Sequence, residues 1–349
     1  MQRGGVYALA VVMFACAPSS QHASDAALVD AAVDAAIPTA SFAIADYSGG
    51  NGKFLLLPIS IDNGPLVNVL LDTGSSGLRI FASALTGQSV ITDSPVTSIQ
   101  FGGGDVFTGP TANAVVSIGG VATPDPIAFQ LVNSVSCVST KPACGSASGM
   151  PTSYTDNGIF GILGASLRAD TPAAIYSPFA QLAKPLGDGF VISAGTFGAT
   201  QGELAFGPVP STDAGFVYLQ LATDTRRSVG APAWKDTPQI CFKIDGAATD
   251  PPCGAANFDT GGNLALVYQT ALPSTKVDSS GFLLPGVTFE AYKSPFDFQL
   301  TIGDPPTTSL DTVRIQTTSV GYVNLSIEPF FRFDVAYDIA QGRIGFRAR

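Results

Sequence analysis

Short runs of β-branched, leucine and aromatic residues recur along the chain from Lys53 onward, separated by glycine, proline and polar residues. Runs of this kind, punctuated by turn residues, are typical of β-strands. Helical stretches are few, and Ala173–Ala183 is the best candidate. The pattern therefore predicts an all-β fold. The clearest strand candidates are Phe54–Ile61, Val96–Phe101, Ala114–Ile118, Ile127–Val132, Phe190–Ser193, Glu203–Phe206, Phe216–Leu221, Ile240–Ile244, Val287–Tyr292, Phe296–Ile302 and Thr312–Thr317.

Residues 1–16 have the pattern of an export signal. Arg3 precedes a short apolar run, Val6–Ala15, which is too short to span a bilayer as a mature helix. The segment Met13–Cys16 resembles a bacterial lipobox, and two outcomes stay open. The protein is either a lipoprotein of the outer membrane or cell surface, lipidated at Cys16, or it is freely secreted. Residues 17–51 are rich in alanine, serine and aspartate, and we expect them to form a solvated tether.

The tripeptide Asp-Thr-Gly occurs twice, beginning at Asp72 and at Asp259. A single copy would be an ordinary strand-to-turn transition, because aspartate and glycine are both common turn residues. The two copies each follow an apolar residue, and about half the chain separates them. We interpret this spacing as an internal duplication into two related lobes, 52–200 and 201–349, with a join near Gly195–Gly207.

Composition narrows the chemistry that the folded part can perform. The only histidine is His22, inside the expected tether, so Ser-His-Asp, Cys-His and histidine-based zinc sites are not available to the lobes. The net charge of −10 disfavours nucleic acid as a partner. No Walker loop or dinucleotide fingerprint is present, and we expect no cofactor and no metal. A hydrolase with this sequence would depend on carboxylates.

The cysteines fit an oxidising compartment. Setting Cys16 aside, they fall into two local pairs in the sequence, Cys137–Cys144 and Cys241–Cys253. Four cysteines allow three pairings, and the sequence does not choose among them. The local pairing closes the shortest loops and is the simplest of the three.

With these motifs the chain resembles the pepsin-like aspartic peptidases, in a bacterial branch, over about residues 52–349. Asp72–Ser76 matches the first catalytic motif of that family, and Ser98–Gly104 with Phe107–Gly109 looks like its flap hairpin. Gly158–Ile162 resembles the apolar-apolar-Gly segment that closes the first active-site loop. The end of the chain, Phe333–Phe346, looks like the C-terminal signature.

The resemblance implies two lobes related by a pseudo-twofold axis, with a cleft between them, in a monomer that hydrolyses protein or peptide substrates. Asp72 and Asp259 would form the catalytic dyad. Two carboxylates in contact share one proton, so one acts as a base on water while the other polarises the scissile carbonyl. The implied supporting residues are Thr73 and Thr260, which lock the two loops together, Ser75, which bonds to Asp72, the turn glycines Gly74 and Gly261, and the flap residues Phe101, Gly102 and Gly103.

Three positions depart from the family pattern. Gly262 follows the second Asp-Thr-Gly where the family has serine or threonine, so Asp259 lacks an expected hydrogen-bond partner. Phe101 replaces the flap tyrosine, and Ser326 replaces glycine in the second apolar-apolar-Gly segment, near Asn324.

These departures leave a second hypothesis open, a catalytically inactive surface module of the same fold that binds peptide or glycan. A carboxylate-based glycosidase is a third and weaker hypothesis. It would need aromatic stacking surfaces, and the chain has one tryptophan, Trp234.

Overall fold

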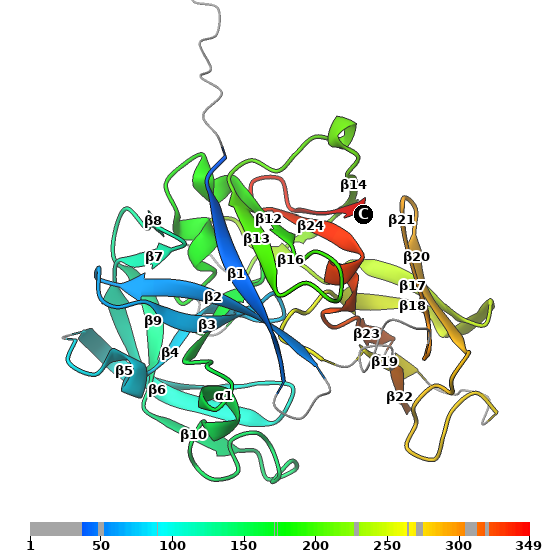
Figure 1. The fold of residues 1–349 in the computed structure, drawn as a ribbon, viewed down its shortest axis with the longest axis horizontal. Coiled ribbons are helices and arrows are strands. Elements are labelled where there is room, and N and C mark those ends of the chain that lie inside the picture. The colour runs from blue at the N-terminus through cyan, green and yellow to red at the C-terminus, as the bar shows by residue number, and fades with distance from the viewer. Residues whose placement is uncertain are drawn as a thin grey trace, which may run out of the picture. The chain divides into compact units, whose positions relative to one another are not determined.

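The structure is a computed structural model that describes residues 37–47, 52–88, 90–170, 172, 174–226, 230–263, 265–269, 275–303, 313–317 and 321–349. The expected export signal, Cys16, His22 and most of the expected tether lie outside these residues. Over the described part, the chain forms strands β1 to β25 and one short α-helix, α1 (Thr152–Thr155) (Figure 1). No helix in this part is long and apolar enough to cross a membrane. The prediction of an all-β fold is confirmed.

The first half of the fold contains seven strands that are hydrogen-bonded in the order β8-β7-β2-β3-β11-β4-β9. The inner strands are buried on both faces, which explains their continuous apolar runs. The bounds are β2 (Lys53–Ile61), β3 (Val67–Asp72), β4 (Ser76–Phe81), β7 (Val116–Ile118), β8 (Val121–Ala122), β9 (Ile127–Val132) and β11 (Gly161–Ala165).

The second half repeats this arrangement with seven strands in the order β21-β20-β17-β18-β23-β19-β22. Corresponding pairs run in the same direction: β3–β11 and β18–β23 are parallel, as are β4–β9 and β19–β22, and the other pairs are antiparallel. The internal duplication inferred from the two Asp-Thr-Gly copies thus has a counterpart in the topology. The bounds are β17 (Gln239–Ile244), β18 (Ala247–Asn257), β19 (Ala265–Gln269), β20 (Thr288–Lys293), β21 (Phe296–Thr301), β22 (Val313–Thr317) and β23 (Tyr322–Asn324).

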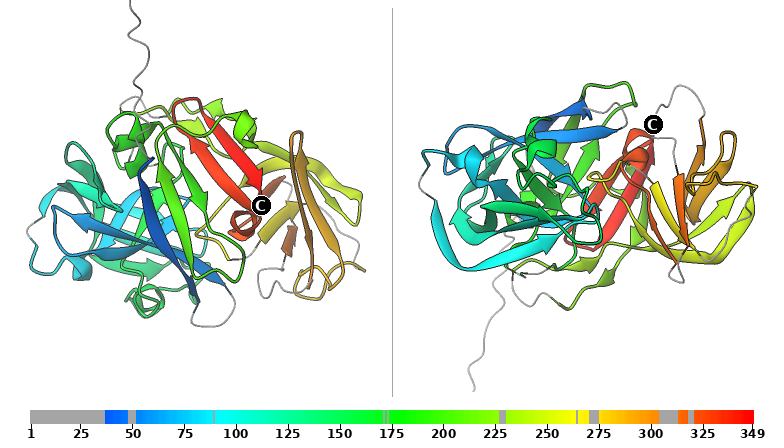
Figure 2. Two further views of the ribbon diagram at one scale, coloured as in Figure 1. Left: turned by 45° about the horizontal axis from the view of Figure 1, so that its top comes forward. Right: turned by 90° about the horizontal axis from the view of Figure 1, so that it is seen from below.

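Six further strands continue the sheet of the first half beyond β2, in the order β1-β13-β12-β24-β25-β14. Figure 2 shows the red C-terminal pair β24–β25 beside the green strands β12 and β13. The expected strand pair at the C-terminus is therefore part of this sheet. The bounds are β1 (Thr39–Asp46), β12 (Gly189–Ser193), β13 (Gln201–Phe206), β14 (Val217–Gln220), β24 (Phe333–Asp338) and β25 (Arg343–Ala348), and a separate pair consists of β15 (Ala222–Thr223) and β16 (Trp234–Lys235).

Strand β1 corrects the expected boundary of the tether. Its residues fall inside 17–51, yet they pair with β2 on one side and β13 on the other. Ala40, Phe42 and Ile44 are buried while their neighbours are exposed, which is the two-residue period of a half-buried strand. The folded part therefore includes Thr39–Asp46.

The predicted helix at Ala173–Ala183 is wrong. In the described residues 174–183 the chain forms a single short 3-10 helix, η2 (Pro178–Gln181). Ser177 lies outside the helical region, with ψ of 123°, because a residue that precedes proline is disfavoured in that region. The other 3-10 helices are η1 (Ala82–Leu85), η3 (Leu186–Asp188), η4 (Thr212–Ala214) and η5 (Glu328–Phe331).

A long hairpin extends from the first half. It consists of β5 (Ile91–Gln100) and β6 (Asp105–Ala114), joined by the turn Phe101–Gly104, and it contains the residues that we expect to form a flap. Strand β10 (Ser134–Cys137) pairs with the start of β6. Both local disulfides, Cys137–Cys144 and Cys241–Cys253, are present. The first one closes the loop that follows β10, and Val138 in that loop donates its N–H to the carbonyl of Gly104 in the hairpin turn.

Candidate active site

The two Asp-Thr-Gly turns meet face to face. Asp72 is the last residue of β3, and Asp259 lies just beyond the end of β18, the corresponding strand of the second half. A side chain added at Gly74 would collide with Oδ1 of Asp259, and one added at Gly261 would lie 2.6 Å from Oδ1 of Asp72. Both glycines are therefore required by the close approach of the opposite carboxyl group.

The threonines of the turns interlock. The Thr73 hydroxyl donates to the carbonyl of Phe258 at 2.7 Å and accepts the N–H of Thr260 at 3.0 Å. The Thr260 hydroxyl donates to the carbonyl of Leu71 at 2.5 Å and accepts the N–H of Thr73 at 3.0 Å. Both threonines are buried. The contacts join segments 187 residues apart in the sequence and hold the two turns in one position relative to each other.

Each carboxyl group accepts a matching set of hydrogen bonds. Asp72 accepts the N–H of Gly74 at 2.7 Å and the hydroxyl of Ser75 at 2.5 Å. Asp259 accepts the N–H of Gly261 at 2.9 Å and the side-chain amide of Asn324 at 2.6 Å. Asn324 is a site residue that the sequence interpretation placed in the right segment but did not assign a contact. The sequence does hold a clue to this residue, because Asn324 is polar where the apolar-apolar-Gly segment would have an apolar residue.

The two carboxyl groups also lie close together, since a Cβ added at Gly261 would be 2.6 Å from Oδ1 of Asp72 and 3.2 Å from Oδ1 of Asp259. Burial, reinforced by the negative charge of Asp72, raises the pKa of Asp259 to about 7. The amide of Asn324 opposes this shift because it donates to the ionised form. At moderately acidic pH, a proton shared by the pair is therefore bound at Asp259.

The segment that closes the first active-site loop lies three residues later than predicted. The prediction was Gly158–Ile162, whereas β11 brings Gly164 opposite Asp72 and Ile162 opposite Leu70. A Cβ at Gly164 would lie 2.7 Å from the carbonyl oxygens of Ser75 and Gly77, so the turn needs glycine there. In the second half, Ser326 takes the corresponding position as predicted. The N–H of Asp259 donates to the carbonyl of Ser326 at 3.2 Å.

A hollow of about 380 Å³ lies between the tip of the β5–β6 hairpin and residues Gly74 and Ser75 of the first turn. Phe101 and Gly102 line it from the hairpin, and Gly103 lies in the same turn. Phe101 packs against Phe107 with ring centres 4.9 Å apart. The hollow is lined by Gly74, Ser75, Ser98, Ile99, Gln100, Phe101, Gly102, Arg168 and Asp170.

Arg79 supports this side of the site and was not anticipated. Its side chain is almost fully buried and donates to the carbonyls of Ser76 and Gly77 at 2.8 and 3.1 Å. Burial lowers the pKa of Arg79 to about 10. The guanidinium lies 5.8 Å from the ring centre of Phe101, a cation–π contact. It thus connects the Asp72 turn to the flap.

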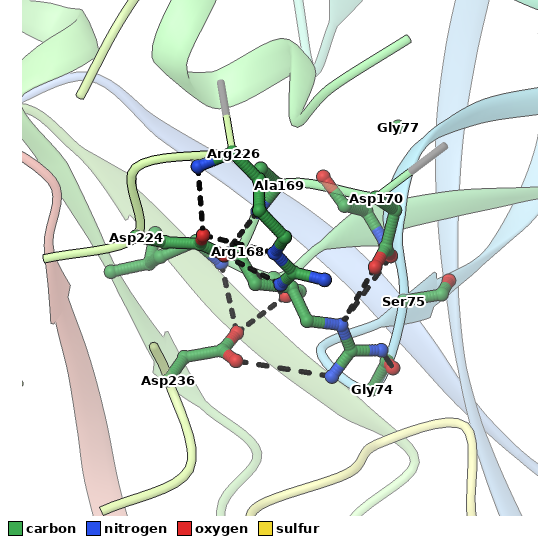
Figure 3. Close-up of polar contacts among 12 residues, drawn as sticks. Gly74, Ser75, Gly77, Arg168, Ala169, Asp170, Asp224, Arg226 and Asp236 are labelled. Atoms are coloured by element: carbon green, nitrogen blue, oxygen red, sulfur yellow. Dashed lines mark hydrogen bonds and ion pairs between the residues drawn. The ribbon is translucent and has the colours of Figure 1, made fainter. Parts of the chain in front are cut away.

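Arg168, also unanticipated, lies at the centre of a charged network against the same turn (Figure 3). Its guanidinium donates to the carbonyl of Gly74 and to Asp170 at 3.1 Å, and it lies 3.8 Å from the buried Asp236. Burial acts to lower the pKa of Arg168, but the carboxylates of Asp236 and Asp170 outweigh it, so the pKa is raised. Asp170 in turn accepts the N–H of Ser76 at 3.2 Å.

Burial raises the pKa of Asp236, and the positive charge of Arg168 offsets part of that shift. The other oxygen of Asp236 accepts the hydroxyl of Ser166 and the N–H of Leu167, which follow β11. Arg168 and Asp170 thus bond to the backbone of the first turn, and Asp236 pairs with Arg168. No sequence motif marks them, because they come together from two separate segments, one after β11 and one after β16.

Comparison with known proteins agrees with this geometry. A family model described as the PE-PGRS C-terminal aspartyl peptidase-like domain matches residues 43–330, which include both Asp-Thr-Gly turns. A search of curated proteins finds no significant match. Because the family model covers most of the chain, the chain belongs to the PE-PGRS C-terminal aspartyl peptidase-like domain family.

Proposed function

We propose that the protein is an aspartic endopeptidase of the pepsin-like type, in which Asp72 and Asp259 activate a water molecule to hydrolyse peptide bonds. The observation that carries the proposal is the close approach of the two carboxyl groups, held by the interlocked threonines. Two carboxyl groups close together, one of which has its pKa raised to about 7, supply an acid and a base at the same pH.

In this mechanism Asp259 holds the proton and Asp72 is ionised. Asp72 takes a proton from the bound water as the water oxygen attacks the carbonyl carbon of the peptide, and Asp259 gives its proton to the carbonyl oxygen. The tetrahedral intermediate then collapses. The C–N bond breaks, the leaving nitrogen receives the proton from Asp72, and the hydroxyl proton returns to Asp259. The proton count is the same before and after the cycle.

The test is digestion of a reduced, alkylated protein substrate between about pH 3 and pH 7. We expect cleavage by the wild type and a loss of at least about 10³-fold in Asp72→Asn and Asp259→Asn, because both carboxyl groups act in the same step. Asp297→Asn is the matched control, since Asp297 is exposed on β21. Absence of cleavage by folded wild-type protein across this range contradicts the proposal.

The alternative of a non-catalytic module that binds peptide or glycan is favoured by one observation, the absence of a hydroxyl at Phe101 on the flap. It predicts that the wild type binds unfolded peptide without turnover, and that Asp259→Asn leaves binding unchanged. Cleavage that disappears in Asp259→Asn rules it out.

We also propose that the protein is exported, either anchored through Cys16 or free. Two disulfides support this proposal, since disulfides persist in oxidising compartments. Metabolic labelling with a fatty acid in a bacterial host separates the two outcomes. Label in the wild type that is lost in Cys16→Ala identifies the lipoprotein, and an unlabelled protein in the medium identifies free secretion.

A further inference from the structure

In each carboxyl group, Oδ2 accepts a hydrogen bond from a side chain, but the two donors come from different elements. In the first half the donor is Ser75, which belongs to the Asp72 turn itself. The equivalent position of the second turn is Gly262, which has no side chain. The donor to Asp259 is instead Asn324 at the end of β23, 65 residues further along the chain.

The position of Asn324 follows from the topology of the duplicated halves. Asn324 pairs with Asn257 two residues before Asp259, as Ile162 pairs with Leu70 two residues before Asp72. The first half therefore has an apolar residue on the strand and a donor in the turn. The second half has the donor on the strand and glycine in the turn. The hydrogen bond to the carboxyl group is kept, and its source has moved.

The amide of Asn324 can point only one way. Its Oδ1 accepts the N–H of Ser326 at 2.8 Å, so its Nδ2 must face Asp259. The bond to Ser326 is an Asx turn, in which the side chain caps the backbone two residues on. Ser326 has φ of +54°, a left-handed conformation that favours glycine. Asn324 therefore accounts for both departures of the second half: it supplies the donor that Gly262 lacks and secures the turn at Ser326.

We propose that Asn324 is the positioning residue of Asp259 and that it replaces the hydroxyl found at Ser75 in the first half. The catalytic part of this inference rests on the proposed peptidase function, whereas the positioning part does not. Asn324 fixes the rotamer of the Asp259 carboxyl group and stabilises its ionised form, so it sets the pH above which the pair loses its shared proton.

The deciding experiment measures the pKa of Asp259 itself, by NMR titration of the carboxyl carbons in protein labelled at aspartate, with Asp259→Asn identifying the signal. In Asn324→Ala we expect the pKa to rise by on the order of one unit, because the ionised form loses a donor. Asn324→Asp keeps the acceptor for Ser326 but replaces the donor by a carboxylate oxygen. It therefore preserves the turn and should raise the pKa further, because a second negative charge lies beside Asp259. Asn68→Ala, an exposed amide on β3, should leave it unchanged.

Kinetics provide the second measurement. In Asn324→Ala we expect kcat/KM to fall by about 10- to 100-fold, as for a lost hydrogen bond to a charged group, and the alkaline limb of the pH profile to move to higher pH with the pKa. Adding Gly262→Ser to Asn324→Ala should restore both, because the new hydroxyl lies where Ser75 lies in the first turn. A Cβ at Gly262 would be 3.3 Å from Oδ2 of Asp259, within reach of a small adjustment.

The two failures are distinguishable. An Asp259 pKa that moves in neither Asn324 variant overturns this inference, whether or not the wild type cleaves peptides. If the pKa of Asp259 rises in the Asn324 variants as expected but the wild type cleaves no peptide, the positioning role is supported and only the proposed function is contradicted.

Discussion

Replacement of Thr260 by valine tests the interlocked turns without reference to activity. Valine has nearly the same shape as threonine, so the change removes a hydroxyl and leaves no large cavity. The lost hydroxyl donates to the Leu71 carbonyl at 2.5 Å and accepts the N–H of Thr73 at 3.0 Å. The side chain is 1% exposed, and water cannot replace either bond.

The magnitude follows from those two bonds. A buried hydrogen bond contributes about 1 kcal/mol to stability, and a buried group left without its partner costs roughly 1–3 kcal/mol. We therefore expect Thr260→Val to lower the free energy of unfolding by about 2–4 kcal/mol. Thr73→Val should cost the same within about 1 kcal/mol, because the Thr73 hydroxyl makes the mirrored bonds to Phe258 and Thr260.

Urea unfolding, followed by tryptophan fluorescence and circular dichroism, measures both changes at constant m-value. Thr86→Val is the matched control, since the Thr86 hydroxyl bonds to the Ser83 carbonyl at the surface, and we expect less than about 0.5 kcal/mol there. If Thr260→Val costs no more than Thr86→Val, the turns are not held together by these bonds, and the geometry proposed for the carboxyl pair has no support.

Three further predictions follow from the charged groups and the disulfide. Asp259 binds its proton more tightly in the folded state, where its pKa is about 7, than in the unfolded state, where it is about 3.9; unfolding free energy should therefore fall as pH rises from 4 to 7. Urea titrations should show this fall in the wild type and a smaller one in Asp259→Asn. Arg168→Met should destabilise the protein by roughly 2–3 kcal/mol because the buried Asp236 loses its counter-charge, and adding Asp236→Asn should recover part of the loss in the same assay. Replacing Cys137 and Cys144 by serine should increase hydrogen exchange at the hairpin turn, which the disulfide-closed loop contacts, while the second half stays protected.

Most strands could be predicted from the sequence because the inner strands are buried on both faces and read as unbroken apolar runs. The exceptions have physical reasons. Strand β1 was hidden in an alanine-rich segment, although its alternation of buried and exposed residues was present. The helix predicted at Ala173–Ala183 does not form because Pro178 keeps Ser177 out of the helical region. The periodicity of apolar residues indicates which side chains are buried, but it does not indicate the backbone restrictions that proline imposes.

The closing segment of the first loop was misplaced for a different reason. Glycine recurs every third residue at Gly158, Gly161 and Gly164, each time followed or preceded by apolar residues. The sequence therefore offers two overlapping apolar-apolar-Gly readings. Only the pairing of β11 with β3, which places Gly164 opposite Asp72, distinguishes them. A choice of register depends on contacts between strands distant in sequence, and a local pattern does not contain it.

The same limit explains why the second turn looked incomplete. Read as a contiguous motif, Asp259-Thr260-Gly261-Gly262 lacks a donor, and Ser326 reads as an unrelated defect in another segment. In the folded chain the parallel pairing of β23 with β18 brings Asn324 to the carboxyl group, where one side chain bonds to both Asp259 and Ser326. What the carboxyl group requires is a donor within about 3 Å, from whichever element can reach it. A contiguous sequence motif therefore misses donors that reach the site from a neighbouring strand. The two departures, Gly262 and Ser326, are not independent losses, because Asn324 compensates for both.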